Sequence, residues 1–489
     1  MKTKICIPIV ENKIEDAITA IQSADSKADI IELRIDFLEE VDERRLAKLI
    51  DTAEKPLIFT CRLKNQGGTG NITEENRKEL LAVAMDKRVD FIDLEFTSDT
   101  IISGTQATKI ITSHHDFDKT PESNEIKSII RQLKTKSGAL VKYIPTANSI
   151  NDNFKIFKML QENENIISFC MGLKGHISRV LAGKYGSAIT FAADSPDKQS
   201  APGQVDFDEL TRGYNFLDID KNTKVYGVFG QFAENSKSKY MHNPVFRRYN
   251  INAVYLPFKI EPGKDLEIFV ENFRKFEFSG ASVTIPHKGA VMEFLDKVDN
   301  TAKAIGAVNT IKLQDGKLIG YNTDCVGAIN TLKEKADLKD KKVLVIGAGG
   351  AARAIVYGLK REQAKVTIIN RTFEKAQNLA AEFTADVMKM DIMAEHLDEF
   401  DIFINTTSVG MHPKVDATVL DSFPENRVVM DIVYKPLKTK FLKMAEKCNC
   451  EIITGEKMLI QQAIVQQKIW TGIKPDFEFM SKSFFEMEE

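Results

Sequence analysis

The chain has 489 residues, of which 67 are lysine or arginine and 70 are aspartate or glutamate, so its net charge at pH 7 is -3. Hydrophobic residues make up 43% and charged residues 28%, which is typical of folded globular proteins and excludes disordered or fibrous classes. At roughly 150 residues per domain, this length predicts about three folded units. The balanced charge lacks the basic excess of nucleic-acid-binding proteins, so we expect no nucleic-acid partner.

The six cysteines are widely spaced, and only Cys448 and Cys450 lie close together, so a disulfide framework is not expected. Their Cys-Asn-Cys motif has no second ligand pair nearby, which argues against a zinc site, and we predict no metal. The N-terminal residues become acidic before a signal-peptide core could form, and no apolar run approaches the roughly 18 residues of a membrane span. We therefore expect a cytoplasmic protein without a membrane partner.

Eight short runs rich in valine, isoleucine and phenylalanine recur through residues 1–192, separated by segments with helical periodicity. They span residues 4–9, 29–33, 56–61, 89–95, 108–113, 139–144, 165–171 and 187–191. Eight strands that alternate with helices over about 200 residues predict a compact (β/α)8 barrel. A doubly wound open sheet is the alternative fold.

Polar side chains stand at the ends of these runs, although strands buried on both faces should be apolar. They are Glu32, Arg34, Arg62, Asp93, Glu95, Ser113, His114, His115 and Asp116. In a barrel these strand ends meet around one mouth, where active sites are built. The pattern therefore predicts a catalytic site there.

Lys142 lies inside the sixth run. A lysine on an edge strand is usually solvated, but a closed barrel has no edge. Inside a barrel the ammonium loses hydration, which favours the neutral amine that can attack a carbonyl and form a Schiff base. A histidine nearby, oriented by a carboxylate, could then move the protons. Because His114 and His115 are adjacent on a strand, at most one of them faces the barrel axis.

These segments resemble the type I 3-dehydroquinate dehydratases over about residues 4–205. The resemblance is carried by ELRID (32–36), CRLKNQGG (61–68), DLE (93–95), SHHDF (113–117), VKYIPTA (141–147), MGLKGHISR (171–179) and SAPGQ (200–204). It implies that Lys142 forms an imine with the substrate ketone, that His115 transfers the proton, and that Glu95 orients His115.

The same resemblance implies a set of substrate-binding residues, which are Glu32, Arg34, Arg62, Arg179, Ser200 and Gln204. Arg179 is matched to the substrate carboxylate, because a guanidinium suits a carboxylate better than a lysine point charge does. Gln66 departs from the family, many of whose members carry an acidic residue at this position.

Residues 341–360 read as an apolar strand, a glycine-rich turn and an amphipathic helix, and another strand follows at 365–372. This context predicts a dinucleotide-binding fold, in which Gly347 permits the tight turn and Gly349 lets the backbone approach a pyrophosphate. The second strand ends without the acidic residue that NAD sites usually place there. Arg371 instead offers a guanidinium to a 2′-phosphate, which favours NADP as the cofactor.

Residues 224–474 resemble shikimate dehydrogenase. The matching segments are SKS (236–238), HNP (242–244), GASVTIPHKGAVMEFLD (280–296), GAVNT (306–310), GYNTDCVGA (320–328), INTTSVGM (404–411), DIVYKP (431–436) and GEKMLIQQA (455–463). The resemblance implies that Lys288 and Asp324 handle the proton at the reacting oxygen. It implies substrate contacts from Ser236, Ser238, Thr284, Asn309, Tyr434 and Gln462. It implies cofactor contacts from Gly347, Ala348, Gly349, Gly350, Ala351, Asn370, Arg371, Thr372, Thr406, Ser408, Met411 and Gly455.

The segment from about 456 to 472 follows the cofactor domain, and Gln462 could reach a substrate only if this segment folds back on the substrate domain. We therefore expect four parts. They are a dehydratase barrel (1–215), a substrate-binding domain (222–326), a Rossmann domain that binds NADP (327–453) and a C-terminal helical segment that returns to the substrate domain (454–489).

The two implied reactions are consecutive, and the order of the regions resembles that of the bifunctional shikimate-pathway enzymes. The expected function is dehydration of 3-dehydroquinate to 3-dehydroshikimate, followed by NADPH-dependent reduction to shikimate. Two alternatives are a non-catalytic regulator that senses quinate or shikimate, and a second module that acts on quinate. The oligomeric state and any direct transfer of the intermediate stay open.

Overall fold

The structure is a computed structural model that describes residues 2–69, 72–98, 100, 104–136 and 139–486. Its internal contacts divide the chain into two compact units. The first contains residues 1–224 and 252–260, and the second contains residues 225–251 and 261–489.

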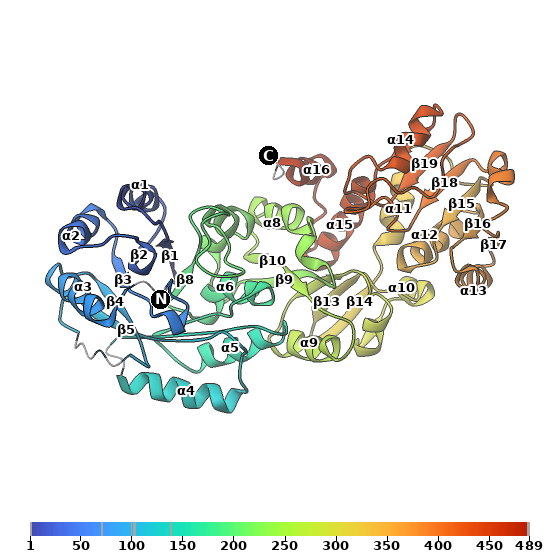
Figure 1. Ribbon diagram of the computed structural model, residues 1–489. Helices are drawn as coiled ribbons and strands as arrows, with labels where there is room; N and C mark the ends of the chain where they lie inside the picture. The colour runs from blue at the N-terminus through green and yellow to red at the C-terminus, as the bar shows by residue number, and fades with distance from the viewer. Residues whose placement is uncertain (1, 70–71, 99, 101–103, 137–138, 487–489) are drawn as a thin grey trace. The chain divides into compact units, whose positions relative to one another are not determined.

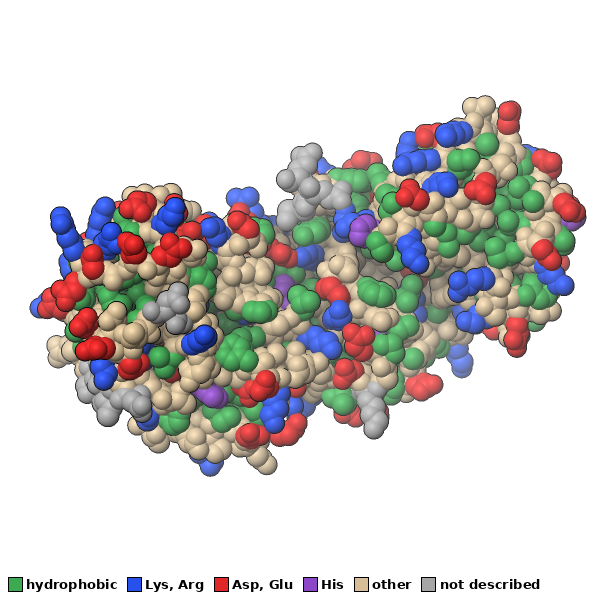
Figure 2. All heavy atoms as spheres, viewed as in Figure 1, with side chains coloured by type: hydrophobic (Ala, Val, Ile, Leu, Met, Phe, Trp, Pro, Cys, Tyr) green, Lys and Arg blue, Asp and Glu red, His purple; other side chains and the backbone are tan. Residues whose placement is uncertain are grey.

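The surface carries charges of both signs. Lysine and arginine side chains are interspersed with aspartate and glutamate over the face shown in Figure 2, as expected from the small net charge. None of the helices in the described part of the chain is both long and apolar enough to cross a membrane.

The first unit contains a sheet of eight parallel strands in the order β7-β6-β5-β4-β3-β2-β1-β8. The strands are β1 (Lys4–Ile9), β2 (Ile30–Arg34), β3 (Leu57–Thr60), β4 (Phe91–Glu95), β5 (Lys109–Asp116), β6 (Leu140–Pro145), β7 (Ile166–Ser168) and β8 (Ile189–Phe191). The ends of the sheet also meet, because the Ala188 N–H donates to the Ile166 carbonyl at 2.8 Å. The sheet is thus a nearly closed barrel, which confirms the (β/α)8 prediction. The open doubly wound alternative is wrong, since its strand order would reverse direction partway across the sheet.

Helices connect the barrel strands and lie outside them (Figure 1). They are α1 (Ile14–Asp25), α2 (Glu43–Thr52), α3 (Glu74–Asp86), α4 (Ser123–Lys136), α5 (Asp152–Gln161), α6 (His176–Val180) and α7 (Ala182–Tyr185). In α2, Leu46, Leu49 and Ile50 recur at helical spacing and are buried in the core between helices and strands. This apolar face holds the helix against the barrel wall, so the strand ends keep fixed positions around the mouth.

A second sheet has six strands in the order β10-β9-β11-β13-β14-β12. They are β9 (Lys224–Gly230), β10 (Ala253–Lys259), β11 (Gly280–Val283), β12 (Lys297–Val298), β13 (Thr310–Gln314) and β14 (Lys317–Tyr321). β11 is parallel to β9 and antiparallel to β13, so the sheet is mixed. The helices of this region are α8 (Ser238–Arg248), α9 (Lys264–Lys275), α10 (Asn300–Ile305) and α11 (Asp324–Lys333).

A third sheet has six parallel strands in the order β17-β16-β15-β18-β19-β20. They are β15 (Lys342–Ile346), β16 (Lys365–Ile369), β17 (Asp386–Val387), β18 (Ile402–Asn405), β19 (Val428–Asp431) and β20 (Glu451–Ile453). The helices are α12 (Gly350–Arg361), α13 (Phe373–Phe383) and α14 (Lys440–Lys447). Counted from β15, this is the 3-2-1-4-5-6 order of the Rossmann fold, which confirms the prediction.

The C-terminal segment contains α15 (Gly455–Thr471) and α16 (Phe477–Glu486). Trp470 Nε1 donates to the Ile311 carbonyl at 2.9 Å, and Ser282 Oγ donates to Gln466 Oε1 at 2.9 Å. These contacts place α15 against strands β11 and β13 of the mixed sheet. Side chains of α15 can therefore take part in a site built by that sheet.

Candidate active sites

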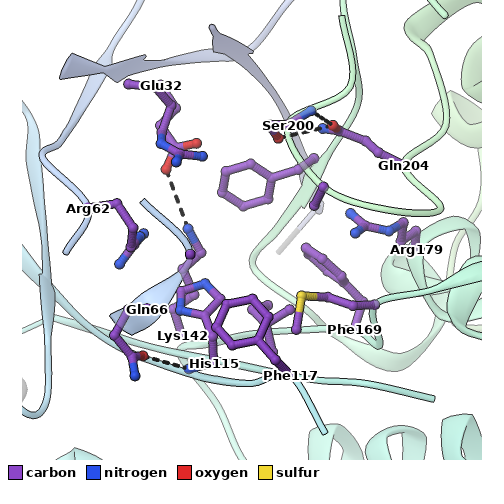
Figure 3. A pocket seen from close by; sticks show the side chains of 16 residues that line it. Glu32, Arg62, Gln66, His115, Phe117, Lys142, Phe169, Arg179, Ser200 and Gln204 are labelled. Atoms are coloured by element: carbon purple, nitrogen blue, oxygen red, sulfur yellow. Dashed lines mark hydrogen bonds and ion pairs between the residues drawn. The ribbon is translucent and has the colours of Figure 1, made fainter. Parts of the chain in front are cut away.

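A pocket opens at the carboxyl ends of the barrel strands (Figure 3). Its lining residues are Glu32, Arg34, Arg62, Gln66, Gly67, His115, Phe117, Lys142, Ile144, Phe169, Met171, Arg179, Phe191, Ser200, Ala201 and Gln204. Every side chain expected at the first site is among them except Glu95. The apolar members, such as Phe117, Phe169 and Met171, were not predicted, because apolar residues at a strand end cannot be told from core residues by pattern alone.

Lys142 projects from β6 into this pocket, and the whole residue is only 5% exposed. Its Nζ donates to Asp93 Oδ2 at 2.9 Å and to Glu32 Oε1 at 3.4 Å, and it lies 4.5 Å from the centre of the Phe191 ring. The amine is withdrawn from bulk solvent, as predicted. Two carboxylates nevertheless bind its Nζ, a pairing that the sequence pattern does not reveal.

Asp93 in β4 is one of the polar strand-end residues, but neither resemblance gives it a role. In the structure it binds Arg62 and Lys142, which both line the pocket. Arg62 Nη1 and Nη2 donate to its two oxygens at 2.9 and 2.7 Å. Burial opposes the charge on Asp93, but Arg62 and Lys142 outweigh it and hold the pKa of this carboxyl well below its usual value. Asp93 and Glu95 are two apart on one strand and so face the same side, which is the pattern that could have identified Asp93.

His115 and His114 lie on opposite sides of β5. His115 lines the pocket, whereas the His114 ring stacks 6.1 Å from the ring of Tyr143. Burial first, and then the positive charges of Arg62 and Lys142, lower the pKa of His115 well below its usual value. The His115 imidazole is therefore neutral near pH 7 and can accept a proton.

The structure does not make the contact expected between Glu95 and His115. The Glu95 carboxylate accepts hydrogen bonds from Arg77 Nη2, from the Leu63 N–H at 2.9 Å and from Arg62 Nη1 at 3.4 Å. His115 Nδ1 is buried without a hydrogen-bond partner among the described residues. The physical reason is charge, because two guanidinium groups bind a carboxylate more strongly than a neutral imidazole does.

Arg179 in α6 is 2% exposed and forms no ion pair with any described acidic residue. Its guanidinium lies 4.3 Å from the centre of the Phe169 ring, and burial lowers its pKa to about 10. Gln204 Nε2 is also buried without a partner among the described residues, while Gln204 Oε1 accepts from Ser200. Arg179 and Gln204 lie on the same side of the pocket (Figure 3). Buried donors left unpaired are costly, so this side is suited to an anionic ligand.

In the second unit, Lys288 Nζ lies 2.5 Å from Asp324 Oδ2. Asp324 is the first residue of α11, and its Oδ1 accepts a hydrogen bond from Asn309 Nδ2 at 2.8 Å. Thr323 Oγ1 accepts from the same amide at 2.9 Å and donates to Gln462 Oε1 at 3.2 Å. Four segments that are distant in sequence thus meet in one polar cluster, which includes α15.

The other expected substrate residues make no hydrogen bond to this cluster within the described structure. Ser236 Oγ donates to Ser238 Oγ at 3.0 Å, just before and at the start of α8. Thr284 follows β11, and Tyr434 packs partly buried against an apolar cluster that includes Ile460. In the described part of the chain, no hydrogen bond joins Ser236, Ser238, Thr284 or Tyr434 to the Lys288–Asp324 pair.

The glycine-rich turn that joins β15 to α12 contains Gly347, Ala348 and Gly349, and α12 begins with Gly350 and Ala351. Gly347 has φ +121°, and a Cβ there would lie 2.4 Å from Thr406 Oγ1, so only glycine fits. A Cβ at Gly349 would meet no atom within 4 Å, which leaves open space before the N-terminus of α12. This is the geometry that receives a phosphate in dinucleotide-binding folds.

The remaining cofactor residues follow neighbouring strands of the Rossmann sheet. Thr406, Ser408 and Met411 come after β18, which pairs with β15. Arg371 comes after β16 and is exposed, between Asn370 and Thr372. A Cβ at Gly455, which begins α15, would lie 2.5 Å from the Ile432 carbonyl oxygen. These residues lie at the carboxyl ends of parallel strands, where dinucleotides bind.

Comparisons with known proteins match the two units separately and together. The family model for type I 3-dehydroquinase matches residues 5–221. The models for the shikimate dehydrogenase substrate binding domain and for shikimate / quinate 5-dehydrogenase match residues 228–311 and 330–434. A chloroplastic bifunctional 3-dehydroquinate dehydratase/shikimate dehydrogenase of Arabidopsis thaliana is 35% identical over 497 residues, which cover 96% of this chain and 82% of that protein.

The chain belongs to the family of bifunctional 3-dehydroquinate dehydratase/shikimate dehydrogenases.

The second unit of this bifunctional chain also matches shorter proteins over nearly their whole length. A shikimate dehydrogenase (NADP(+)) of Methanococcus maripaludis is 44% identical over 274 residues, which are 54% of this chain and 97% of that protein. A crystal structure of shikimate 5-dehydrogenase from Thermus thermophilus in complex with NADP(H) and shikimate is 32% identical, with a TM-score of 0.51. That match covers 54% of this chain and 99% of the other.

Proposed function

We propose that the barrel dehydrates 3-dehydroquinate to 3-dehydroshikimate, and that the second unit reduces this product to shikimate with NADPH. The observation that carries the proposal is the pocket in which a buried Lys142 lies near a neutral His115 and near Arg179, which has no ionic partner in the described part of the chain. The Lys288–Asp324 pair on the same chain as a Rossmann sheet supports the second reaction.

In the barrel, the neutral Lys142 amine attacks the substrate ketone, a C–N bond forms, and the carbonyl oxygen leaves as water. The iminium withdraws electrons from the neighbouring carbon, so His115 can remove a proton from it. The imidazolium then returns a proton to the hydroxyl on the next carbon, which departs as water. Hydrolysis of the imine releases 3-dehydroshikimate and restores Lys142.

The proposed substrate contacts in the barrel come from Glu32, Arg34, Arg62, Arg179, Ser200 and Gln204. Two of the arginines already bind carboxylates, since Arg34 donates to Asp36 at 2.8 and 2.9 Å and Arg62 to Asp93. Arg179 has no such partner among the described residues. It is therefore the cation that can bind the substrate carboxylate.

Arg179→Gln is expected to raise the KM of the dehydratase reaction about 100-fold, because a charge-assisted contact worth roughly 3 kcal/mol is lost. The turnover rate should fall less, since Arg179 does not take part in proton transfer. Initial rates of dehydration at varied substrate concentration measure both constants. Arg179→Lys should recover only part of the loss, because lysine cannot make two parallel hydrogen bonds. An unchanged KM in folded Arg179→Gln protein would show that another residue binds the carboxylate.

The second unit fits NADP because Gly347 leaves no room for a Cβ, Gly349 opens onto the N-terminus of α12, and Arg371 is exposed after β16. The residues that would hold the cofactor are Gly347, Ala348, Gly349, Gly350, Ala351, Asn370, Arg371, Thr372, Thr406, Ser408, Met411 and Gly455. When bound, NADPH supplies the hydride. Lys288 hydrogen-bonds the ketone oxygen and protonates it as negative charge develops, and Asp324 holds the ammonium in place.

Around this pair, the proposed substrate contacts come from the serines of the 236–238 segment and from side chains near the Lys288–Asp324 cluster. They are Ser236 and Ser238 for the carboxylate, Thr284, Asn309 and Gln462 for the ring hydroxyls, and Tyr434 beside the substrate. The hydrogen bonds that join Asn309 to Asp324 and Thr323 to Gln462 support this assignment.

Arg371→Gln is expected to lower kcat/KM for NADPH about 30-fold while NADH turnover changes less than about threefold, because only NADPH carries the 2′-phosphate. Steady-state rates with 3-dehydroshikimate and each cofactor measure the ratio. Arg361→Gln, at an exposed position on α12, is the matched control and should change neither value. Equal losses with both cofactors would remove Arg371 from the phosphate site.

We further propose domain limits at residues 1–215, 222–326, 327–453 and 454–489. The barrel strands end within the first range, the mixed sheet lies in the second and the Rossmann sheet in the third, which supports these limits.

The described structure pairs none of the six cysteines in a disulfide, which suits a reducing compartment such as the cytoplasm.

Incubation of the full chain with 3-dehydroquinate and NADPH tests the proposed function. The expected result is shikimate, with one NADPH oxidised for each shikimate formed. Binding of 3-dehydroquinate without turnover would identify a metabolite-sensing regulator instead. Direct reduction of 3-dehydroquinate to quinate would identify the second unit as a quinate dehydrogenase.

A further inference from the structure

Arg77 lies outside the pocket, in helix α3, yet it is only 1% exposed. Its Nε donates to the Cys61 carbonyl at 3.0 Å, and its Nη2 donates to the buried Glu95. Its Nη1 donates to Ser98 Oγ at 2.9 Å and lies 3.4 Å from Oε1 of the more exposed Glu74. A buried ion pair contributes little net stability compared with apolar packing, so the fold alone does not explain an arginine at this position.

Arg77 begins a chain of alternating charges that ends at Lys142. Glu95 Oε1 lies 3.4 Å from Arg62 Nη1, Arg62 donates to both oxygens of Asp93, and Asp93 binds Lys142 Nζ at 2.9 Å. The five side chains are between 0% and 7% exposed. Because solvent screens such groups weakly, a change of charge at one end is felt at the other.

Arg62 has two acidic neighbours, Asp93 and Glu95, and binds Asp93 more closely. It makes two hydrogen bonds of 2.7 and 2.9 Å with Asp93 and one long contact of 3.4 Å with Glu95, whose charge Arg77 already balances. Without Arg77, Arg62 would be the remaining cation beside Glu95 within this charge chain and would be drawn toward it. Asp93 would then bind mainly Lys142, and their ion pair would become stronger.

Lys142 can attack a ketone only as the free amine. A stronger ion pair with Asp93 and an additional unbalanced negative charge would both favour the ammonium. We propose that Arg77 is a positioning residue for the dehydratase reaction. It acts through Glu95 and Arg62 and weakens the ion pair between Asp93 and Lys142. The inference rests on the proposed function, since it concerns Lys142 as the amine that forms the imine.

Several other charged or titratable groups face Lys142 or the pocket around it. They are Cys6 from β1, Glu32 and Arg34 from β2, His115 from β5 and Arg179 from α6. None of these residues hydrogen-bonds or forms an ion pair with Arg77 in the described structure. A substitution at Arg77 therefore changes the environment of Lys142 through Glu95 and not through them.

The pH dependence of imine formation tests the inference. With 3-dehydroquinate and cyanoborohydride, the imine is reduced to a stable secondary amine whose amount is measured by mass spectrometry. Arg77→Met is expected to move the pH of half-maximal trapping upward by about one unit, which is about tenfold less adduct below the midpoint. Lys78→Met removes an exposed positive charge from the next position of α3 and is the matched control, with an unchanged curve.

Two variants of Glu95 separate this effect from a general loss of structure. Arg77→Met/Glu95→Gln removes both charges and should return the midpoint close to that of the wild type. Glu95→Gln alone leaves Arg77 with the 3.4 Å contact to Glu74 as its remaining acidic partner in the described structure. It should move the midpoint downward, which tests the inference even where Arg77→Met does not fold. An unshifted curve in folded Arg77→Met protein, or an upward shift with Glu95→Gln, would overturn it. A wild-type protein that forms no adduct would refute the proposed function itself, a result distinct from any effect of Arg77.

Discussion

Lys142→Met is expected to slow the dehydration of 3-dehydroquinate at saturating substrate at least about 10,000-fold, because the only proposed nucleophile is removed while a side chain of similar length is kept. Reduction of 3-dehydroshikimate by the same protein should stay within about twofold of the wild type, since Lys142 belongs to the first unit. Separate assays of the two reactions on one protein preparation measure both effects.

The variant leaves Glu32 and Asp93 without their shared cation, so its thermal unfolding is measured alongside its activity. Lys127→Met, which removes an exposed lysine from α4, is the control and should keep full dehydratase activity. Dehydration above about one hundredth of the wild-type rate in Lys142→Met would rule out an obligatory imine at this residue.

Lys288→Met is expected to slow the reduction of 3-dehydroshikimate at saturating substrate about 1,000-fold, because the group that protonates the reacting oxygen is lost. The Lys288 stem packs beside Gly350, since a Cβ added to Gly350 would lie 3.4 Å from Lys288 Cδ. The methionine keeps an apolar stem at this place. The KM for NADPH should therefore change less than about threefold. NADPH oxidation after addition of 3-dehydroshikimate measures both the turnover rate and this KM.

Asp324→Asn should slow the same reduction about 100-fold, because the amide is neutral and no longer holds the Lys288 ammonium electrostatically. The dehydratase activity of each variant is the internal control and should be unchanged. If Lys288→Met reduced 3-dehydroshikimate at more than about a tenth of the wild-type rate, the proton would have to come from another group.

The sequence pattern was sufficient to predict the barrel, and the strand limits show where such a pattern loses information. The predicted strand at 108–113 continues to Asp116 in β5, where His114 pairs with Tyr143 and His115 with Ile144. Polar residues at the mouth hide this extension, because they interrupt the apolar run without interrupting the hydrogen bonds. The predicted strand at 165–171 is shorter in the structure, where β7 ends at Ser168 although Phe169 and Met171 remain buried. Burial alone does not make a strand.

In the site, too, local sequence pattern identifies single residues, whereas the contacts between them depend on the fold. Lys142 was identifiable because a lysine inside a barrel strand is unusual. Strand alternation showed that at most one of His114 and His115 faces inward, and the family resemblance indicated His115. The pairing of charges was not identifiable. How the cations pair with the carboxylates depends on distances between separate strands and helices. This is why the sequence pattern indicates no role for Asp93 or Arg77, and why the contact expected between Glu95 and His115 differs from the hydrogen bonds that Glu95 makes.

Borohydride reduction in the presence of 3-dehydroquinate, followed by mass spectrometry of the digested protein, tests the central claim most directly. A single stable adduct on the peptide that contains Lys142, absent without 3-dehydroquinate, is the predicted result. An adduct on a different lysine, or full dehydratase turnover with no adduct at all, would contradict it.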